Sequence, residues 1–166
     1  VYGQPRLAPC TAMAVYELVK DYHGDVRGAE ICIVGHSAIV GKPAMLLLLS
    51  DLGTTTTCHI GTRNLAEHTC RADILVVAVG KPDLITGEMI RPGATVIDVG
   101  INRVPMLDQA GQPVLTEKGR PRCRTVGDVV FGEAAEVAAA ITPVPGGVGQ
   151  VTTAILLRNT VQAARW

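Results

Sequence analysis

Short runs of apolar residues, separated by segments with helical spacing, are the feature that most limits how this chain of 166 residues can fold. The clearest run, 74–79, reads Ile-Leu-Val-Val-Ala-Val and is followed by Gly80. A strand that is apolar on both faces is typical of a parallel sheet covered by helices on each side. The alternation of the two patterns therefore predicts an α/β domain with a doubly wound, mainly parallel sheet.

The same patterns predict where each element lies. Strands are expected at 30–34, 55–59, 74–79, 94–99 and 140–142, and helices at 12–22, 43–51, from Asn64, at 133–139 and at 152–164, with one helical turn at 86–90. Thr11 is expected to cap the first helix, and Asn64 with Glu67 to form a capping box. Residues 102–125 are polar and unpatterned, which favours a surface excursion with a hairpin around Ala110 and Gly111. This order of elements is Rossmann-like.

Composition favours one domain and excludes several classes of function. The 15 basic and 15 acidic residues cancel, so no global field would attract nucleic acid or an anionic membrane. The longest apolar runs are far shorter than the roughly 20 residues that span a bilayer. The cysteines are scattered and lack C-x-x-C spacing, which indicates reduced thiols, with Cys32 and Cys58 as small core residues. We expect a soluble, cytoplasmic protein without a metal site.

Two loops that follow predicted strands are candidates for ligand binding. Residues 141–150 read Ile-Thr-Pro-Val-Pro-Gly-Gly-Val-Gly-Gln, so prolines fix the backbone and glycines let it approach a flat molecule. The alternative is a tight strand-to-helix connection without a ligand. Residues 35–43 read Gly-His-Ser-Ala-Ile-Val-Gly-Lys-Pro, where a dinucleotide-binding fold has its first βα turn.

The loop at 35–43 matches neither common phosphate-binding motif. Ser37 stands where G-x-G-x-x-G has its second glycine. Gly41 comes one residue too late for a nucleoside-triphosphate loop, and Pro43 replaces the Ser or Thr that such a loop needs. A dinucleotide site is the better physical account, with the amides of Gly41 and of the helix start facing an anionic group.

The residues after the second strand bear on the choice between NAD and NADP. An NAD site usually has an acid there, whereas this chain has His59. His36, Thr62 and Arg63 are able to accommodate a 2′-phosphate. Equally, His36 would cap the nearby helix, Arg63 would be a solvated charge, and His59 would be a half-buried strand end.

Two acids adjoin both an apolar run and a glycine, namely Asp98 and Asp128. Neither has a base or a metal partner at a suitable spacing, so we interpret both as carboxylates that accept backbone N–H groups in turns. No Ser/His/Asp order, metal-ligand cluster or activated cysteine stands out. We therefore assign no catalytic residue within this chain.

Spaced segments along nearly the whole chain resemble one known family. They are Pro-Cys-Thr at 9–11, Val-Gly-His-Ser-Ala-Ile-Val-Gly-Lys-Pro at 34–43, Cys-His-Ile-Gly-Thr at 58–62, Ala-Asp-Ile-Leu-Val-Val-Ala-Val-Gly-Lys-Pro at 72–82, Ile-Asp-Val-Gly-Ile-Asn at 97–102, Gly-Asp-Val-Val-Phe at 127–131 and Ile-Thr-Pro-Val-Pro-Gly-Gly-Val-Gly at 141–149. In this order they are similar to the C-terminal NAD(P)-binding domain of the bifunctional methylenetetrahydrofolate dehydrogenase/methenyltetrahydrofolate cyclohydrolase family.

The resemblance implies a multifunctional enzyme, an oxidoreductase and hydrolase of one-carbon metabolism and purine biosynthesis. Such an enzyme oxidises 5,10-methylenetetrahydrofolate by hydride transfer to NADP and hydrolyses the methenyl product to 10-formyltetrahydrofolate. The family's folate-binding domain precedes the Pro-Cys-Thr segment and carries the catalytic Lys of a Tyr-x-x-x-Lys helix, a Gln and an Asp, none of which has a counterpart here. The chain is then the cofactor domain of a homodimeric enzyme, and we expect its gene to begin upstream of Val1.

The resemblance also implies site residues. The cofactor-contacting residues are Gly35, His36, Ser37, Ile60, Ile101 and Thr142, and the residues that face the substrate are Pro145, Gly146 and Gly147. The family often has Arg at the position of His36 and Ser at that of Ile60, both near the 2′-phosphate, which leaves NAD as the alternative to NADP. Gln150 and Val151 replace the usual Pro-Met and alter the fit to the pterin side.

By the same likeness the chain divides into an interdomain helix at 1–25, the NAD(P)-binding domain at 26–150, and a C-terminal helix at 151–166 that returns toward the absent folate domain. The alternative to the cofactor half of an enzyme is a stand-alone dinucleotide-binding module without turnover.

Overall fold

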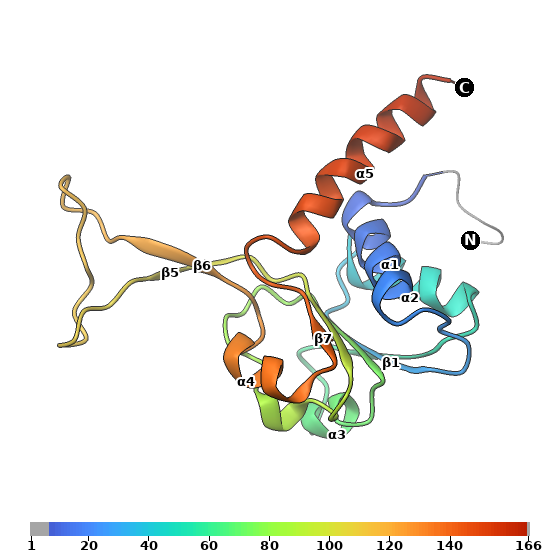
Figure 1. The fold of residues 1–166 in the computed structure, drawn as a ribbon, viewed down its shortest axis with the longest axis horizontal. Helices are drawn as coiled ribbons and strands as arrows, with labels where there is room; N and C mark the ends of the chain where they lie inside the picture. The colour runs from blue at the N-terminus through green and yellow to red at the C-terminus, as the bar shows by residue number, and fades with distance from the viewer. Residues whose placement is uncertain (1–6, 166) are drawn as a thin grey trace.

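Five parallel strands form the central sheet of the computed structural model, which describes residues 7–165 (Figure 1). They are β1 (Glu30–Val34), β2 (Thr54–Cys58), β3 (Ile74–Val77), β4 (Thr95–Asp98) and β7 (Ala140–Ile141), in the spatial order β2-β1-β3-β4-β7. The chain runs outward from β1 to β2 and then returns to β3 on the other side of β1, so its winding reverses between β1 and β3. Ligands of such sheets bind at the carboxyl ends of the strands beside this point. The predicted Rossmann-like α/β fold is confirmed.

Helices cover both faces of the sheet. One face carries α1 (Cys10–Tyr22), α2 (Gly41–Ser50) and α5 (Val148–Ala163), and the other carries α3 (Leu65–Thr69), the 3-10 turn η1 (Gly87–Met89) and α4 (Phe131–Val137). No helix in the described part of the chain is long and apolar enough to cross a membrane.

The strands are buried on both sides because alternate residues enter two separate cores. In β1, Ile31 and Ile33 enter the core beneath α1 and α2, and Cys32 and Val34 enter the core on the side of α3 and α4. None of these four side chains is more than 3% exposed. As expected, Cys32 and Cys58 are free core thiols; their sulfur atoms lie 3.8 Å apart, and burial raises the pKa of the Cys32 thiol.

The predicted caps of two helices are wrong. α1 begins directly after Pro9, which has a φ of −52° and a ψ of 129° and occupies the cap position without a side-chain acceptor, so no side chain caps the start of the helix. Thr11 lies inside the first turn. Before α3, Asn64 has a left-handed φ of 50°, and its side-chain amide donates to Glu67 Oε1 at 3.0 Å, so it does not cap the helix.

The outer helices pack closely on the sheet. α1 contributes Ala12, Ala14, Val15 and Val19 to the core, all fully buried. α5 begins at Val148, four residues before the predicted start at 152. The division into 1–25, 26–150 and 151–166 stays a prediction, and its outermost residues, 1–6 and 166, lie outside the described part of the chain.

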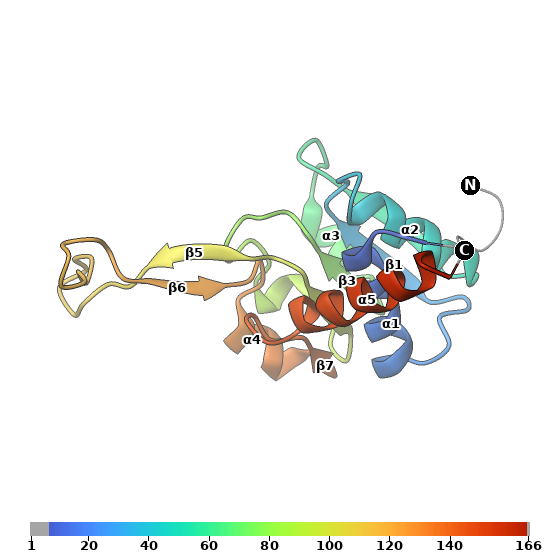
Figure 2. The ribbon, with the colours of Figure 1, turned by 90° about the horizontal axis from the view of Figure 1, so that it is seen from above.

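The polar excursion forms an arm that extends away from the sheet (Figure 2). Its base is an antiparallel pair, β5 (Asn102–Pro105) and β6 (Cys123–Val126). Two smaller turns follow at its end, closed by bridges between Leu107 and Pro113 and between Leu115 and Pro121. The predicted hairpin at Ala110 and Gly111 is therefore only the first of these turns, because the long ladder pairs residues far outside it.

A hydrogen bond connects α1 to the end of α2. The Tyr16 hydroxyl donates to Asp51 Oδ2 at 2.7 Å, and Lys20 Nζ reaches the same oxygen at 3.1 Å. The bond raises the pKa of Tyr16 to about 12, and it also lowers the pKa of Asp51.

Replacing Tyr16 by Phe should lower the free energy of unfolding by about 1 kcal/mol at pH 8 in urea titrations. Because folding raises the pKa of Tyr16 above its ordinary 10.0, this contribution is fully present below pH 10 and is lost as the pH rises through about 12. Tyr22→Phe, at a side chain that is 58% exposed, is the control and should change stability by less than about 0.5 kcal/mol.

The same variant tests the raised pKa directly. The absorbance at 295 nm should rise equally in the wild type and in Tyr16→Phe up to pH 11, because Tyr16 stays protonated there. A clearly smaller rise in the variant would contradict this assignment.

Candidate functional site

Asp98 is a buried carboxylate at the carboxyl edge of the sheet. It ends β4, is 3% exposed, and accepts hydrogen bonds from the amides of Gly100, Asp128 and Val129 at 2.9–3.0 Å. Burial raises the pKa of Asp98, and these three hydrogen bonds oppose that rise. The carboxylate thus holds the loop before α4 against the end of β4.

Asp128 is a second buried carboxylate, and it holds the loop that follows the neighbouring strand, β3. It is fully buried and accepts hydrogen bonds from the amides of Val79 and Gly80, just after β3, at 2.7 and 2.9 Å. It also accepts one from Asn102 Nδ2, at the base of the arm, at 2.8 Å. Both aspartates therefore act as the sequence predicts, accepting backbone N–H groups in turns.

Two glycines allow these carboxylates to approach the backbone. A Cβ atom on Gly127 would overlap Asp98 Oδ2, and one on Gly100 would overlap Asp128 Oδ1. Both glycines are therefore required by contacts within the chain rather than by a ligand.

A pocket of about 480 Å³ lies over the ends of β1, β2 and β3, beside the reversal of winding. We name it the β1–β2 pocket. It is lined by Val34, Gly35, His36, Ser37, His59, Ile60, Thr62, Leu65, Ala78, Val79, Lys81 and Leu84. Four of the six predicted cofactor-contacting residues thus come together here. Gly35 has a φ of +118°, and a Cβ atom on it would overlap the Ala78 carbonyl, so it also allows β1 and β3 to end in close contact.

The amides at the start of α2 are used within the loop itself. Ser37 Oγ accepts from the amides of Val40 and Gly41 at 3.2 and 3.4 Å, and the Ser37 carbonyl accepts from the amide of Lys42 at 3.0 Å. The Gly41 amide therefore does not face an anion as predicted, because Ser37 occupies it. Ser37, not His36, is the residue that bonds to the helix start.

Two histidines stand side by side in the β1–β2 pocket. The ring centroids of His36 and His59 are 5.2 Å apart, with their planes at 53°. His59 Nδ1 accepts from the amide of Gly61 at 3.1 Å, and the His59 amide donates to Thr62 Oγ1 at 2.8 Å. Both histidines are exposed, so the prediction of a half-buried His59 is wrong: the chain turns outward directly after β2.

A second pocket, of about 350 Å³, lies over the ends of β4 and β7. We name it the β4–β7 pocket. Its lining includes Ile101, which is 71% exposed, together with Pro145 and Gly146 of the Pro/Gly loop. Gly146 has a φ of +111° with open space where a side chain would lie, so the loop does present bare backbone here.

Two predicted site residues do not line either pocket. Thr142 is 4% exposed, and its Oγ1 accepts from the amide of Asp98 at 2.9 Å, which joins β7 to β4. Gly147 is packed inside the loop, where a Cβ atom would lie 2.6 Å from the Pro143 carbonyl oxygen. Each of them is next in sequence to residues that line the β4–β7 pocket.

Other lining residues were not among those predicted. Lys81 and Leu65 line the β1–β2 pocket, and Thr11 and Thr125 line the β4–β7 pocket. Lys81 had a signal, because it follows a predicted strand at the ligand-binding edge. Arg63, an expected phosphate partner, is exposed and is not among the described lining residues.

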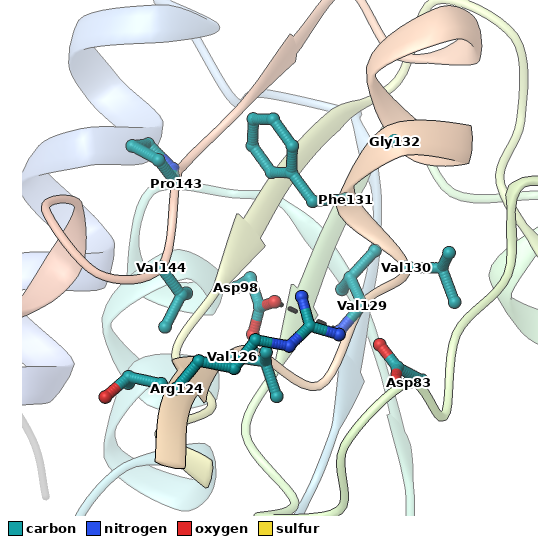
Figure 3. Close-up of a pocket in the computed structure, with 12 residues that line it drawn as sticks. Asp83, Asp98, Arg124, Val126, Val129, Val130, Phe131, Gly132, Pro143 and Val144 are labelled. Carbon is teal, nitrogen blue, oxygen red and sulfur yellow. Dashed lines mark hydrogen bonds between the residues drawn. The ribbon is translucent and has the colours of Figure 1, made fainter. Parts of the chain in front are cut away.

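A third pocket, of about 540 Å³, lies between the base of the arm and α4 (Figure 3). Arg124 extends across it, and Phe131 and Val144 stand on its sides. Asp98 forms part of its wall through the carboxylate that binds Val129. Within the described residues, no group of three or more His, Cys, Asp or Glu side chains could hold a metal ion.

The substitution Gly127→Ala tests the carboxylate network. The added methyl group overlaps Asp98, so we expect the free energy of unfolding to fall by about 2–3 kcal/mol. The control is Gly132→Ala within α4, where an added Cβ atom would meet no atom within 4 Å outside its own helix, and it should be neutral or stabilising by up to about 1 kcal/mol. Equal stability of Gly127→Ala and the wild type in urea unfolding would show that the glycine is not needed.

Comparison with known proteins agrees with this geometry. Residues 9–166 match the family model described as tetrahydrofolate dehydrogenase/cyclohydrolase, NAD(P)-binding domain. The chain is 54% identical over 162 residues to "Bifunctional protein FolD 3" of Rhizorhabdus wittichii and 52% identical over 163 residues to "Bifunctional protein FolD" of Acetivibrio thermocellus. It covers 50% and 52% of their lengths, with 98% of the chain aligned in each case. The chain thus spans about half the length of the curated relatives it matches.

Solved structures give the same result. A bifunctional FolD enzyme from Campylobacter jejuni superposes with a TM-score of 0.82 at 41% identity, over 96% of this chain and 51% of that one. The Trypanosoma brucei FolD enzyme, described as complexed with NADP cofactor and inhibitor, superposes with a TM-score of 0.83 at 40% identity, with the same coverage.

Proposed function

Since the chain belongs to the tetrahydrofolate dehydrogenase/cyclohydrolase family as an NAD(P)-binding domain, we propose that it binds NADP for the oxidation of 5,10-methylenetetrahydrofolate. The same enzyme would then hydrolyse the methenyl product to 10-formyltetrahydrofolate. The observation that carries the proposal is the pair of pockets at the carboxyl edge, one over the ends of β1, β2 and β3 where the winding reverses and the other over the ends of β4 and β7. The NADP in the Trypanosoma brucei relative supports the choice of cofactor.

The two pockets suit the two ends of a dinucleotide. They are about three strand spacings apart in the sheet, or roughly 14 Å at 4.8 Å per strand. A dinucleotide in this fold lies across the crevice where the strand order reverses. We assign the adenosine end to the β1–β2 pocket and the nicotinamide end to the β4–β7 pocket. The cofactor residues are then Gly35, His36, Ser37 and Ile60 at the first, and Ile101 at the second with Thr142 behind it.

The contribution of this chain to catalysis is positioning. The nicotinamide ring of bound NADP supplies the hydride acceptor. Ile101 offers an exposed apolar side chain against which a flat ring packs. Pro145 and Gly146 form the edge of the pocket, with Gly147 fixing the turn, and we assign these three residues to the substrate side. The acid and base groups of both reactions belong to the other half of the enzyme.

The surface of α5 supports a place for that other half. Leu156, Leu157 and Val161 are 54%, 65% and 52% exposed, and α5 extends beyond the sheet with α1 packed beside it (Figure 1). We propose that the folate-binding half covers this apolar surface. The assembled enzyme would be a cytoplasmic homodimer.

The chain by itself should bind NADP in calorimetric titrations but should not turn over 5,10-methylenetetrahydrofolate in an assay of NADPH absorbance. The reason is that it carries the cofactor pockets without the catalytic groups. Turnover by this chain would contradict the assignment of those groups to the other half, and failure to bind either NADP or NAD would contradict the proposed function.

The substitution Ile101→Glu places a charge where the nicotinamide ring is expected. It should weaken NADP binding at least tenfold in the same titrations, which is about 1.4 kcal/mol. Leu107→Glu is the matched control, since this arm residue is similarly exposed, at 59% against 71%, and lies outside both pockets. Equal losses in the two variants would contradict the placement of the ring.

A further inference from the structure

We propose that His36, His59 and Lys81 form the subsite for the 2′-phosphate of NADP, and that phosphate binding there is coupled to the uptake of protons by the two imidazoles. This inference rests on the proposed function, because it assigns one group of the dinucleotide within the same site. It also names the residues that select NADP in a chain whose loops lack the family's usual Arg and Ser.

The position of the two rings carries the proposal. Both line the β1–β2 pocket, with centroids 5.2 Å apart. His59 follows β2 directly, where dinucleotide-binding folds recognise the 2′ position of the ribose. A phosphate group beside both rings would receive one N–H donor from each.

A hydrogen bond within the loop fixes the proton position on the ring of His59. Its Nδ1 accepts the amide hydrogen of Gly61 at 3.1 Å, so the neutral ring carries its proton on Nε2. Nε2 is then a donor even before the ring becomes charged. The Thr62 hydroxyl, which accepts the His59 amide at 2.8 Å, also lines the pocket and has its own hydrogen to donate.

The charges around the rings favour an anion. Three loops face the pocket: the loop after β1 brings His36, the loop after β2 brings His59, and the loop after β3 brings Lys81. Among the described lining residues Lys81 is the only permanent charge, and none is a carboxylate. A subsite for the bare ribose hydroxyls of NAD would instead present an acid as acceptor.

The coupling to protons follows from the same distances. Two protonated imidazoles at this separation repel each other, whereas a phosphate dianion beside them favours the charged forms. Binding of NADP therefore takes up protons, and its affinity rises as the pH falls. Below about pH 6 the phosphate itself becomes protonated, so the gain levels off. An Arg in this place would stay charged and give no such dependence.

Calorimetric titration of the chain with NADP and NAD at pH 6.5 and 8.5, in buffers of different ionisation enthalpy, tests the proposal. NADP should bind at least fivefold more tightly at the lower pH with net proton uptake, and NAD should show neither effect. His36→Gln and His59→Gln should each reduce proton uptake and weaken NADP binding at pH 6.5 at least fivefold, with NAD binding changed less than twofold. Lys81→Gln should weaken NADP binding at both pH values and leave the proton uptake in place.

His23→Gln is the matched control, because this histidine follows α1 and lies outside the pocket. It should change none of these quantities. Binding of NADP without proton uptake, or NADP binding that is unchanged in both histidine variants, would overturn the proposal while leaving the proposed function intact. Failure of the wild-type chain to bind either dinucleotide would instead overturn the proposed function, and the subsite with it.

Discussion

The buried pair Asp98 and Asp128 is the constraint on which the ligand-binding edge of this protein depends. Each carboxylate binds backbone amides that come from distant parts of the chain, up to 49 residues away in sequence. Together they join the ends of β3 and β4 to the base of the arm and to the start of α4. A buried carboxylate is tolerated only when hydrogen bonds replace the water it has lost, and the amides of these loops supply them. If these loops moved away, the buried carboxylates would lose their hydrogen-bond partners.

This network explains why the edge is rich in glycine. Gly100 and Gly127 make room for carboxylate oxygens, and Gly35 makes room for the Ala78 carbonyl. Gly146 differs from these three, because it has a positive φ with open space beside it and lines the β4–β7 pocket. In a fold that binds a flat cofactor along its sheet edge, glycines serve first to bring the strand ends together and only locally to admit the ligand.

The sheet could be predicted well because the signals that mark strands and loops are local in the sequence. Continuous apolar runs and their spacing located the strands to within about two residues, and glycines and prolines marked the loops. The interpretation of Asp98 and Asp128 as acceptors of backbone N–H groups also held. Their mutual connection could not be predicted, because it joins residues brought together only by the sheet order. Ser37 was missed for a different reason: its hydroxyl accepts from amides only three and four residues further along the chain, and the motif comparison considered glycines at this position rather than a side-chain acceptor.

The two histidines show how the site differs from a simple motif. From the sequence alone, a helix cap was an equally good interpretation of His36, and a strand end was an equally good interpretation of His59. The parallel pairing of β1 with β2 places the loops that follow these strands side by side, which brings the two histidine rings together. Together the rings suggest an anion-binding subsite, which neither histidine suggests alone. With Lys81 from the next strand, cations and potential cations come from three loops at one end of the crevice, whereas the described lining of the β4–β7 pocket at the other end contains no Lys, Arg or His. This polarity matches a dinucleotide with a phosphate at one end and a nicotinamide ring at the other.

A crystal structure of the chain grown with NADP tests the central claim most directly, namely that the two pockets hold the two ends of one dinucleotide. We expect the 2′-phosphate between the rings of His36 and His59 and the nicotinamide ring against Ile101 and the Pro145 turn, with the pyrophosphate crossing the end of β1. A dinucleotide bound instead in the pocket between the arm and α4, or with its two ends exchanged, would contradict the claim.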